Sequence, residues 1–291
     1  MKFHKFCFSL FSFARPLTFI IFLFQISSQT PSYSQPSQSF QSPNDLFTSG
    51  KVNSAILAWT QLINRGIDVY PSLYNRAQAY IVIKQFKSAL SDLNTLEIKR
   101  RPFVDPQVLS LKGVVLNELG DYKQALQSLD LSLKLSKTAY SLTNRGVIYQ
   151  KLGNLPKAEQ DFLDASIIDP SYSNFYNLAS LQLSQKKYSD CANNANKALT
   201  LLNSPFYPGY TVRGICFYHL NRYEESIADL LRSASINQFQ PEAYLFLGMA
   251  LLKVNRAAEA KSYLLKSADI FLEQSKQPEY QEVMKTLSSI P

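Results

Sequence analysis

Few residues in this sequence of 291 have the types and spacing that catalysis or metal binding requires. Of the two histidines, His4 lies near the N-terminus and His219 stands alone, so neither a metal cluster nor a catalytic triad can form around them. The sequence also contains no C-x-x-C pair, no P-loop and no G-x-G-x-x-G segment. We therefore expect no catalytic residue, no metal and no cofactor.

Two short patterns match catalytic ones by their letters only. Residues 184–187, SQKK, fit the S-x-x-K pattern of some serine acyl-transfer enzymes, but they fall at an expected turn without a partner motif. Asp161 and Asp164 are three residues apart on an expected helix, where we place both on the exposed face. We interpret both patterns as surface features and predict that the chain is not an enzyme.

The distribution of charge argues against nucleic acid as a partner. The formal charge is +8, and it falls to +5 without residues 1–28, because Lys2, Lys5 and Arg15 lie there. Elsewhere acidic and basic residues are mixed within single expected helices, as in KAEQDFLD. The basic run Lys99–Arg101 is interpreted as a solvated loop. The sequence lacks the basic stripe that phosphate binding needs.

The three cysteines give little information at this level. Cys7 lies in the N-terminal segment, and Cys191 and Cys216 lie in the regular part of the sequence. A disulfide needs Cα atoms within about 7 Å of each other, which the spacing cannot establish. Two buried thiols are the expectation, and their oxidation state stays open.

Small residues recur in pairs twelve positions apart, and the pairs themselves recur along the sequence. The pairs are Ala77 and Ala89, Gly113 and Ala125, Gly146 and Ala158, Ala179 and Cys191, Gly214 and Ser226, and Gly248 and Ala260, with a weaker copy at Pro43 and Ala55. Successive second members lie 33 to 36 residues apart. A fixed period of this length indicates an array of structural repeats.

Each repeat has the pattern of two antiparallel helices. Apolar residues recur at helical spacing in residues 139–152 and again in residues 155–165. Gly153 lies between the two stretches, where glycine can adopt a positive φ. Gly50 and Gly120 hold the same position in two other repeats. Gly146 and Ala158 then lie where the two helices cross closest, since larger side chains would separate the helix axes.

These small pairs, framed by large apolar residues, resemble the tetratricopeptide repeat (TPR) family over residues 44–274. The resemblance implies an all-α fold, a right-handed superhelical solenoid of antiparallel helix pairs. We expect units near residues 45–69, 70–105, 106–138, 139–171, 172–206, 207–240 and 241–274, followed by a C-terminal capping helix at 275–291.

Several positions depart from this pattern or add to it. The first helix of the first unit is short and polar, and Ala195 stands where the other units have a large residue. Arg76, Arg145 and Arg213 adjoin the small residue and are expected to lie along the seam between helices. Tyr280, Val283, Met284 and Leu287 form the apolar stripe of the capping helix.

The N-terminal segment is expected to be an export signal. Residues 1–28 contain basic residues, then the apolar run Leu17–Ile26, then small and polar residues, and no acid. An uncleaved membrane anchor over residues 6–26 is the alternative, against which Arg15 costs about 2.5–3.5 kcal/mol. Residues 29–44 are rich in Ser, Gln and Pro, which is typical of a disordered linker. We expect a periplasmic, secreted or organellar-lumen protein, or a membrane-anchored one.

In the TPR family, the first helices of successive units line a concave groove that binds peptides. The resemblance points to Tyr74, Asn75, Thr143, Asn144, Tyr176, Asn177 and Thr211 as groove residues. The asparagines resemble the ladder by which some TPR proteins hold a peptide main chain, because an amide both donates and accepts. The other interpretation is that each asparagine bonds only the neighbouring helix. Leu111, Val212 and Phe246 interrupt the ladder, and no lysine supports a clamp for acidic C-termini.

We therefore predict a non-enzymatic scaffold or adaptor that binds a peptide or a partner protein in the groove of the array. The alternative is a structural subunit of an envelope or organellar assembly that docks through its ends or its convex face. The sequence does not name the partner, because the repeats explain how helices stack and not what they bind.

Overall fold

The described part of the chain is entirely helical in its regular structure. A computed structural model describes residues 41–99, 104–202 and 204–290. These residues fall into two compact units that divide between Ile168 and Asp169. We call them the N-terminal unit and the C-terminal unit. The predicted export signal and most of the predicted linker lie outside the described residues.

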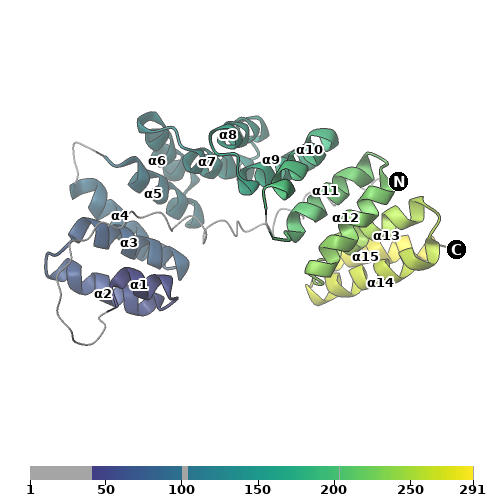
Figure 1. The fold of residues 1–291 in the computed structure, drawn as a ribbon, viewed down its shortest axis with the longest axis horizontal. Coiled ribbons are helices and arrows are strands. Elements are labelled where there is room, and N and C mark those ends of the chain that lie inside the picture. The colour runs from purple at the N-terminus through teal and green to yellow at the C-terminus, as the bar shows by residue number, and fades with distance from the viewer. Residues whose placement is uncertain (1–40, 100–103, 203, 291) are drawn as a thin grey trace. The chain divides into compact units, whose positions relative to one another are not determined.

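Antiparallel helix pairs build both units (Figure 1). The N-terminal unit contains α1 (Pro43–Thr48), α2 (Val52–Asn64), α3 (Val69–Val82), α4 (Phe86–Lys99), α5 (Pro106–Glu118), α6 (Tyr122–Leu135), α7 (Ala139–Lys151) and α8 (Leu155–Ile168). The C-terminal unit contains α9 (Tyr172–Ser184), α10 (Tyr188–Thr200), α11 (Tyr207–His219), α12 (Tyr223–Ile236), α13 (Pro241–Lys253), α14 (Ala257–Glu273) and α15 (Gln277–Ser288). Within each unit every helix packs on the next. The predicted all-α array of helix pairs is confirmed.

The turns between paired helices share one backbone conformation. Gly120 and Gly153 have φ values of 82° and 76°, as the pattern predicted. The same turn in other repeats has no glycine, and there Lys84, Lys186 and Asn221 adopt φ values of 60° to 61°. A lysine in the left-handed region costs about 1–2 kcal/mol. The repeat packing therefore imposes the turn even where the local sequence opposes it.

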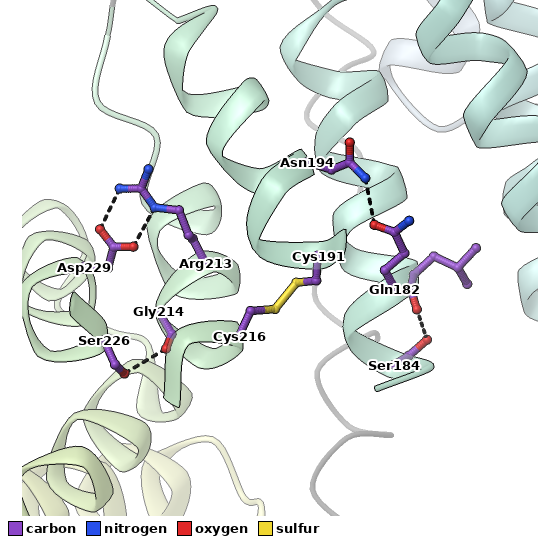
Figure 2. The surroundings of a disulfide bond; sticks show 10 residues. Gln182, Ser184, Cys191, Asn194, Arg213, Gly214, Cys216, Ser226 and Asp229 are labelled. Atoms are coloured by element: carbon purple, nitrogen blue, oxygen red, sulfur yellow. Dashed lines mark hydrogen bonds and ion pairs between the residues drawn. A yellow bond between two sulfur atoms is a disulfide. The ribbon is translucent and has the colours of Figure 1, made fainter. Parts of the chain in front are cut away.

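The small residues lie at the closest approach of the two helices in a pair, as predicted. A Cβ atom on Gly146 would lie 2.8 Å from Phe162 Cε1 and 3.3 Å from the carbonyl oxygen of Ala158. In another pair the Ser226 hydroxyl donates directly to the carbonyl oxygen of Gly214 at 2.7 Å (Figure 2). Small side chains at both positions therefore let the two helix backbones come into contact.

A buried ion pair joins the two helices of three repeats, along the predicted seam. Arg76, Arg145 and Arg213 donate to the carboxylates of Asp92, Asp161 and Asp229, respectively, each sixteen residues later. Each guanidinium makes two hydrogen bonds to its aspartate, with lengths of 2.7–2.9 Å. The predicted exposed position of Asp161 is wrong, because this residue is buried at 4% exposure. Asp161 faces α7, and only its neighbour Asp164 reaches outward, to Lys137.

Cationic side chains on the first helices also contact the second helix of the preceding repeat. Arg145 Nη1 donates to Asp130 Oδ1 at 2.7 Å, and Lys112 Nζ donates to Glu97 Oε2 at 2.7 Å. Arg213 Nη1 donates to Asn196 Oδ1 at 2.6 Å in the C-terminal unit. One cation on a first helix thus ties neighbouring repeats together as well as the two helices of its own pair.

The first and last helices cover exposed ends of the repeats. The six-residue α1 begins at a capping box between Ser42 and Asp45, and its Phe47 ring lies 5.7 Å from the Trp59 ring of α2. At the other end, α15 buries Val283 and Leu287 against the core of α13 and α14. Met284, predicted on the same apolar stripe, is instead exposed at 36%. None of the described helices is long and apolar enough to span a membrane.

The expectation of two buried thiols is wrong in one respect. Cys191 of α10 and Cys216 of α11 are both fully buried, but they form a disulfide. Their Cα atoms lie 6.3 Å apart, which is within the usual range for such a bond. The bond therefore joins the second helix of one repeat to the first helix of the next.

Candidate functional site

In the N-terminal unit, the predicted binding residues lie on two first helices. Tyr74 and Asn75 of α3 and Thr143 and Asn144 of α7 are all half-buried. Each of these residues is therefore partly packed against the chain and partly accessible to a ligand.

Both asparagines in this unit already have a partner within the chain. Asn75 Nδ2 donates to Asn44 Oδ1 at 3.2 Å, and Asn144 Nδ2 donates to the carbonyl oxygen of Tyr140 at 2.7 Å. Asn75 thus bonds a residue of another helix, α1, whereas Asn144 bonds its own helix, α7. An amide has further donor and acceptor capacity, so these bonds do not use up either side chain.

Tyr74 of α3 and Tyr140 of α7 are near enough to interact electrostatically. Burial raises the pKa of Tyr140, and the nearby Tyr74 phenol adds to this rise, while the Asn144 amide opposes it. Burial, and after it the Asp105 carboxylate, raises the pKa of Tyr74. Part of the Tyr140 side chain is nevertheless accessible, since 42% of the residue is exposed. The N-terminal unit therefore presents neutral phenols beside amides. We call Tyr74, Asn75, Tyr140, Thr143 and Asn144 the tyrosine–asparagine face.

In the C-terminal unit, Tyr176 and Asn177 lie on α9 and are half-buried. The Tyr176 ring packs edge-on against Phe206 at 5.2 Å between ring centroids. Burial raises the pKa of Tyr176, and the Tyr207 phenol contributes to the rise. This tyrosine is therefore held in place by the segment that leads into α11.

Thr211 does not present its hydroxyl to a ligand. The residue is 6% exposed, and its Oγ1 lies 2.6 Å from the Ser233 hydroxyl. Oγ1 also lies within hydrogen-bond distance of the Tyr207 carbonyl oxygen and the Gln240 amide oxygen, at 3.1 Å each. We therefore leave Thr211 out of the candidate site. Thr211 and Tyr74 hold the same position in their repeats, and this equivalence does not reveal that the Thr211 side chain is buried.

The interruptions of the asparagine ladder have a physical explanation. Leu111, Val212 and Phe246 are only 5–8% exposed, so their side chains belong to the core. The position two residues before the small residue is therefore half-buried in α3, α7 and α9 and buried in α5, α11 and α13.

The patterns that matched catalytic motifs have structural roles. The Ser184 hydroxyl donates to the carbonyl oxygen of Leu181 at 2.6 Å, at the end of α9 (Figure 2). Lys187 immediately precedes α10. Of the basic run, only Lys99 lies within the described residues, where it ends α4. No group of three His, Cys, Asp or Glu residues in the described ranges is arranged to hold a metal ion.

His219 is placed in an aromatic cluster that sequence reasoning did not find. Its ring stacks on Tyr188 at 4.3 Å and lies 5.8 Å from Phe246. Its Nε2 is buried and, among the described residues, has no hydrogen-bond partner. Burial first, and then the positive charge of Lys186, lowers the pKa of His219.

This environment predicts a pH dependence of stability. Because the pKa of His219 is lower in the folded chain than the usual value of about 6.5, its stabilising contribution is present above that value. The contribution is lost as the pH falls through the folded value, since the unfolded chain then binds the extra proton. We expect the melting temperature to fall between pH 7 and pH 5, and to fall less in His219→Phe. An NMR titration that places the His219 pKa at or above 6.5 contradicts this prediction.

Models of a known repeat family match part of the chain. Models of the tetratricopeptide repeat match residues 106–138, 138–168 and 241–272. These matches cover the helix pairs α5–α6, α7–α8 and α13–α14. The fold is a TPR array. Proteins with TPR repeats are generally protein-binding scaffolds, and the repeat itself is typically non-catalytic.

A curated relative and a solved structure are also similar to this chain. Tetratricopeptide repeat protein 6 of Homo sapiens is 33% identical over 89 residues, which is 30% of this chain and 17% of that protein. The chain thus spans less than a fifth of that relative's length. Among solved structures, the Cut9–Hcn1 hetero-tetramer of the APC/C matches 84% of this chain and 48% of its own, with a TM-score of 0.67 and 15% identity.

A smaller solved structure is similar over most of its own length. YrrB, described as a TPR protein with an unusual peptide-binding site, is covered to 96% and matches 67% of this chain. Its TM-score is 0.57 and its identity is 16%. At such identities the likeness establishes the fold alone.

Proposed function

We propose that this chain is an exported, non-enzymatic scaffold that binds an extended peptide or a partner protein on the first helices of its TPR array. The observation that carries the proposal is the tyrosine–asparagine face of α3 and α7. Asn75 and Asn144 lie beside Tyr74 and Tyr140, and all four are partly exposed. Amides bond a peptide main chain whatever its side chains are, and tyrosines add large contact area at low conformational cost.

The chemistry of this face favours a neutral or aromatic peptide. The five residues of the face carry no charge at neutral pH, because the pKa values of Tyr74 and Tyr140 are raised. The nearby arginines Arg76 and Arg145 are already bonded to carboxylates. An acidic tail would find no available cation among these residues, whereas an uncharged segment would lose little on desolvation.

Affinity capture with the full-length chain tests the binding proposal. The bait is the wild type beside Asn75→Ala/Asn144→Ala, and bound proteins from envelope and cytosolic extracts are identified by mass spectrometry. We expect the variant to retain about tenfold less of the partner, since each lost hydrogen bond weakens binding by about 0.5–1.5 kcal/mol. Gln127→Ala, at an exposed site on α6, is the matched control. A partner that is retained equally by all three baits contradicts the proposal.

The C-terminal unit is tested separately with Asn177→Ala, because Asn177 lies on α9. Asn193→Ala, at an exposed site on α10, is its control. If only Asn177→Ala loses the partner, the binding face belongs to the C-terminal unit and the assignment to α3 and α7 is wrong.

One observation favours the alternative, a structural subunit of an envelope or organellar assembly that docks through its ends or its convex face. Leu131 and Leu135 of α6 and Leu163 and Ile167 of α8 are 41–71% exposed. An ion pair links the two, since Nζ of Lys137, just after α6, lies 2.8 Å from Oδ2 of Asp164 on α8. Loss of the partner from Leu135→Glu, with full retention by the asparagine variant, would favour this alternative.

Export is proposed from the residue pattern of positions 1–28, and an uncleaved anchor over residues 6–26 remains the alternative form of that proposal. The mass of the mature protein distinguishes the two. Cleavage near residue 28 removes the anchor, and an intact N-terminus retains it.

A further inference from the structure

The disulfide lies within an apolar cluster at the seam between two repeats. Cys191 and Cys216 have 0% exposure, and the surrounding cluster contains Ala192, Ala195 and Ile215. Figure 2 shows the bond between α10 and α11, and beside it the ion pair that joins Arg213 of α11 to Asp229 of α12. Water and dissolved thiols therefore have no access to the sulfur atoms while this seam is closed.

Small side chains explain why the two helices come close enough for the bond. Cys191 occupies the second small site of its repeat, where other repeats have Ala158 or Ala260. Ala195, which stands where the other repeats have a large residue, is fully buried one turn further along α10. The unusual alanine therefore leaves space at the α10 side of the cross-linked seam.

Aromatic side chains close one end of the seam. Tyr188 precedes Cys191 by one helical turn, and His219 follows Cys216 by one turn. Their rings are stacked, with an interplanar angle of 11°. The Tyr218 and Phe246 rings lie edge-on to the His219 ring. This cluster shields the sulfur atoms further and makes the bond hard to reduce without unfolding.

We propose that Cys191–Cys216 is a permanent structural cross-link, formed when the chain folds in an oxidising compartment, and not a switch. In its formation the two thiols lose two protons and two electrons, and a disulfide-donating oxidoreductase is reduced to its dithiol form. Such bonds persist in secreted, periplasmic and lumenal proteins and are rare in the cytosol. The bond and its burial do not depend on the N-terminal segment or on the tyrosine–asparagine face.

Peptide mapping of the wild-type chain tests the bond without any variant. The full-length protein is isolated from an exporting host and denatured with iodoacetamide in the absence of a reductant. Trypsin then releases Cys191 in residues 188–197 and Cys216 in residues 214–222. We expect these peptides to be joined and unalkylated, and to separate only after reduction. Alkylation of both cysteines without reduction overturns the proposal.

A thermal measurement tests whether the cross-link is structural. We expect Cys191→Ala/Cys216→Ala to melt about 8 °C lower than the oxidised wild type, because a disulfide mainly restricts the unfolded chain. Alanine suits the small site of Cys191, as it does in other repeats, so the loss reports the bond rather than packing at that site. The reduced wild type should have the same melting temperature as the double variant. Equal melting of oxidised wild type and the variant contradicts a structural role, whatever the outcome of partner capture.

The permanence of the bond is tested under native conditions. A millimolar dithiol added to the folded protein should leave the cross-link intact, and the same dithiol in denaturant should reduce it. Rapid native reduction would contradict a permanent cross-link and indicate a switch.

Discussion

Replacement of Gly146 by leucine should destabilise the N-terminal unit by about 3 kcal/mol. Even a single added Cβ atom would lie 2.8 Å from the ring of Phe162, which is 1% exposed and cannot move aside. The carbonyl oxygen of Ala158, also on α8, would lie 3.3 Å from this Cβ atom, so the two helices would have to separate. Better helix propensity offsets only about 1 kcal/mol of this cost. Urea denaturation followed by circular dichroism measures the change.

Val147→Leu is the matched control for this substitution. It adds one methylene to the neighbouring half-buried residue of α7, and we expect it to cost less than about 1.5 kcal/mol. If the two variants are equally stable, the small residues do not mark the closest contact between paired helices, and the explanation of the twelve-residue spacing fails.

Removal of the Asp161 carboxylate should also cost about 3 kcal/mol, since breaking one side of a buried ion pair removes the main compensation of the other charge. Arg145 donates to Asp161 through Nε at 2.9 Å and through Nη2 at 2.7 Å. Asp161→Ala leaves Arg145 with Asp130 as its one remaining acidic partner in this contact. The free energy of unfolding of the variant measures the loss, and Arg145→Met in the same chain should recover part of it.

Asp164→Ala on the same helix is the control for the buried pair. Its partner Lys137 is exposed over 59% of its side chain, so the pair contributes about 0–1 kcal/mol. A loss from Asp164→Ala as large as that from Asp161→Ala would show that burial does not set the cost. An unchanged stability of Asp161→Ala would contradict the structural role of the arginine–aspartate pairs.

The repeat architecture could be predicted from the sequence because sterics act locally at a few positions. A small residue at Gly146 and another at Ala158 are required by close helix packing, and both types are visible in the sequence. The turn at Gly153 is visible for the same reason, since its φ of 76° favours glycine. The equivalent turn at Lys186 could not be predicted from the sequence. There the packing of the helix pair imposes a positive φ, which lysine disfavours.

The partners of side chains were harder to predict than the helices. Asp161 was placed on the exposed face because helical spacing relates it to Asp164 and says nothing about a residue on α7. The sixteen-residue spacing from Arg145 to Asp161 was a usable signal, since it recurs from Arg213 to Asp229. Pairing of Cys191 with Cys216 depends on the distance between two helices, which spacing does not give.

The candidate site was predicted only in outline. Register alone places Thr211 with Tyr74, although packing encloses Thr211 and leaves Tyr74 half-buried. The contribution of Tyr140 was missed, because it lies one turn before Asn144 and outside the register position of the ladder. Its proximity to Tyr74 becomes apparent only when α3 and α7 are folded into one unit.

The proposed binding face is tested most directly by the Kd of a captured partner for three forms of the chain. These are the wild type, Asn75→Ala/Asn144→Ala, and the second-helix control Gln127→Ala. We predict that the asparagine variant binds about tenfold more weakly, while the control matches the wild type. Equal affinity of all three forms would contradict peptide recognition on α3 and α7.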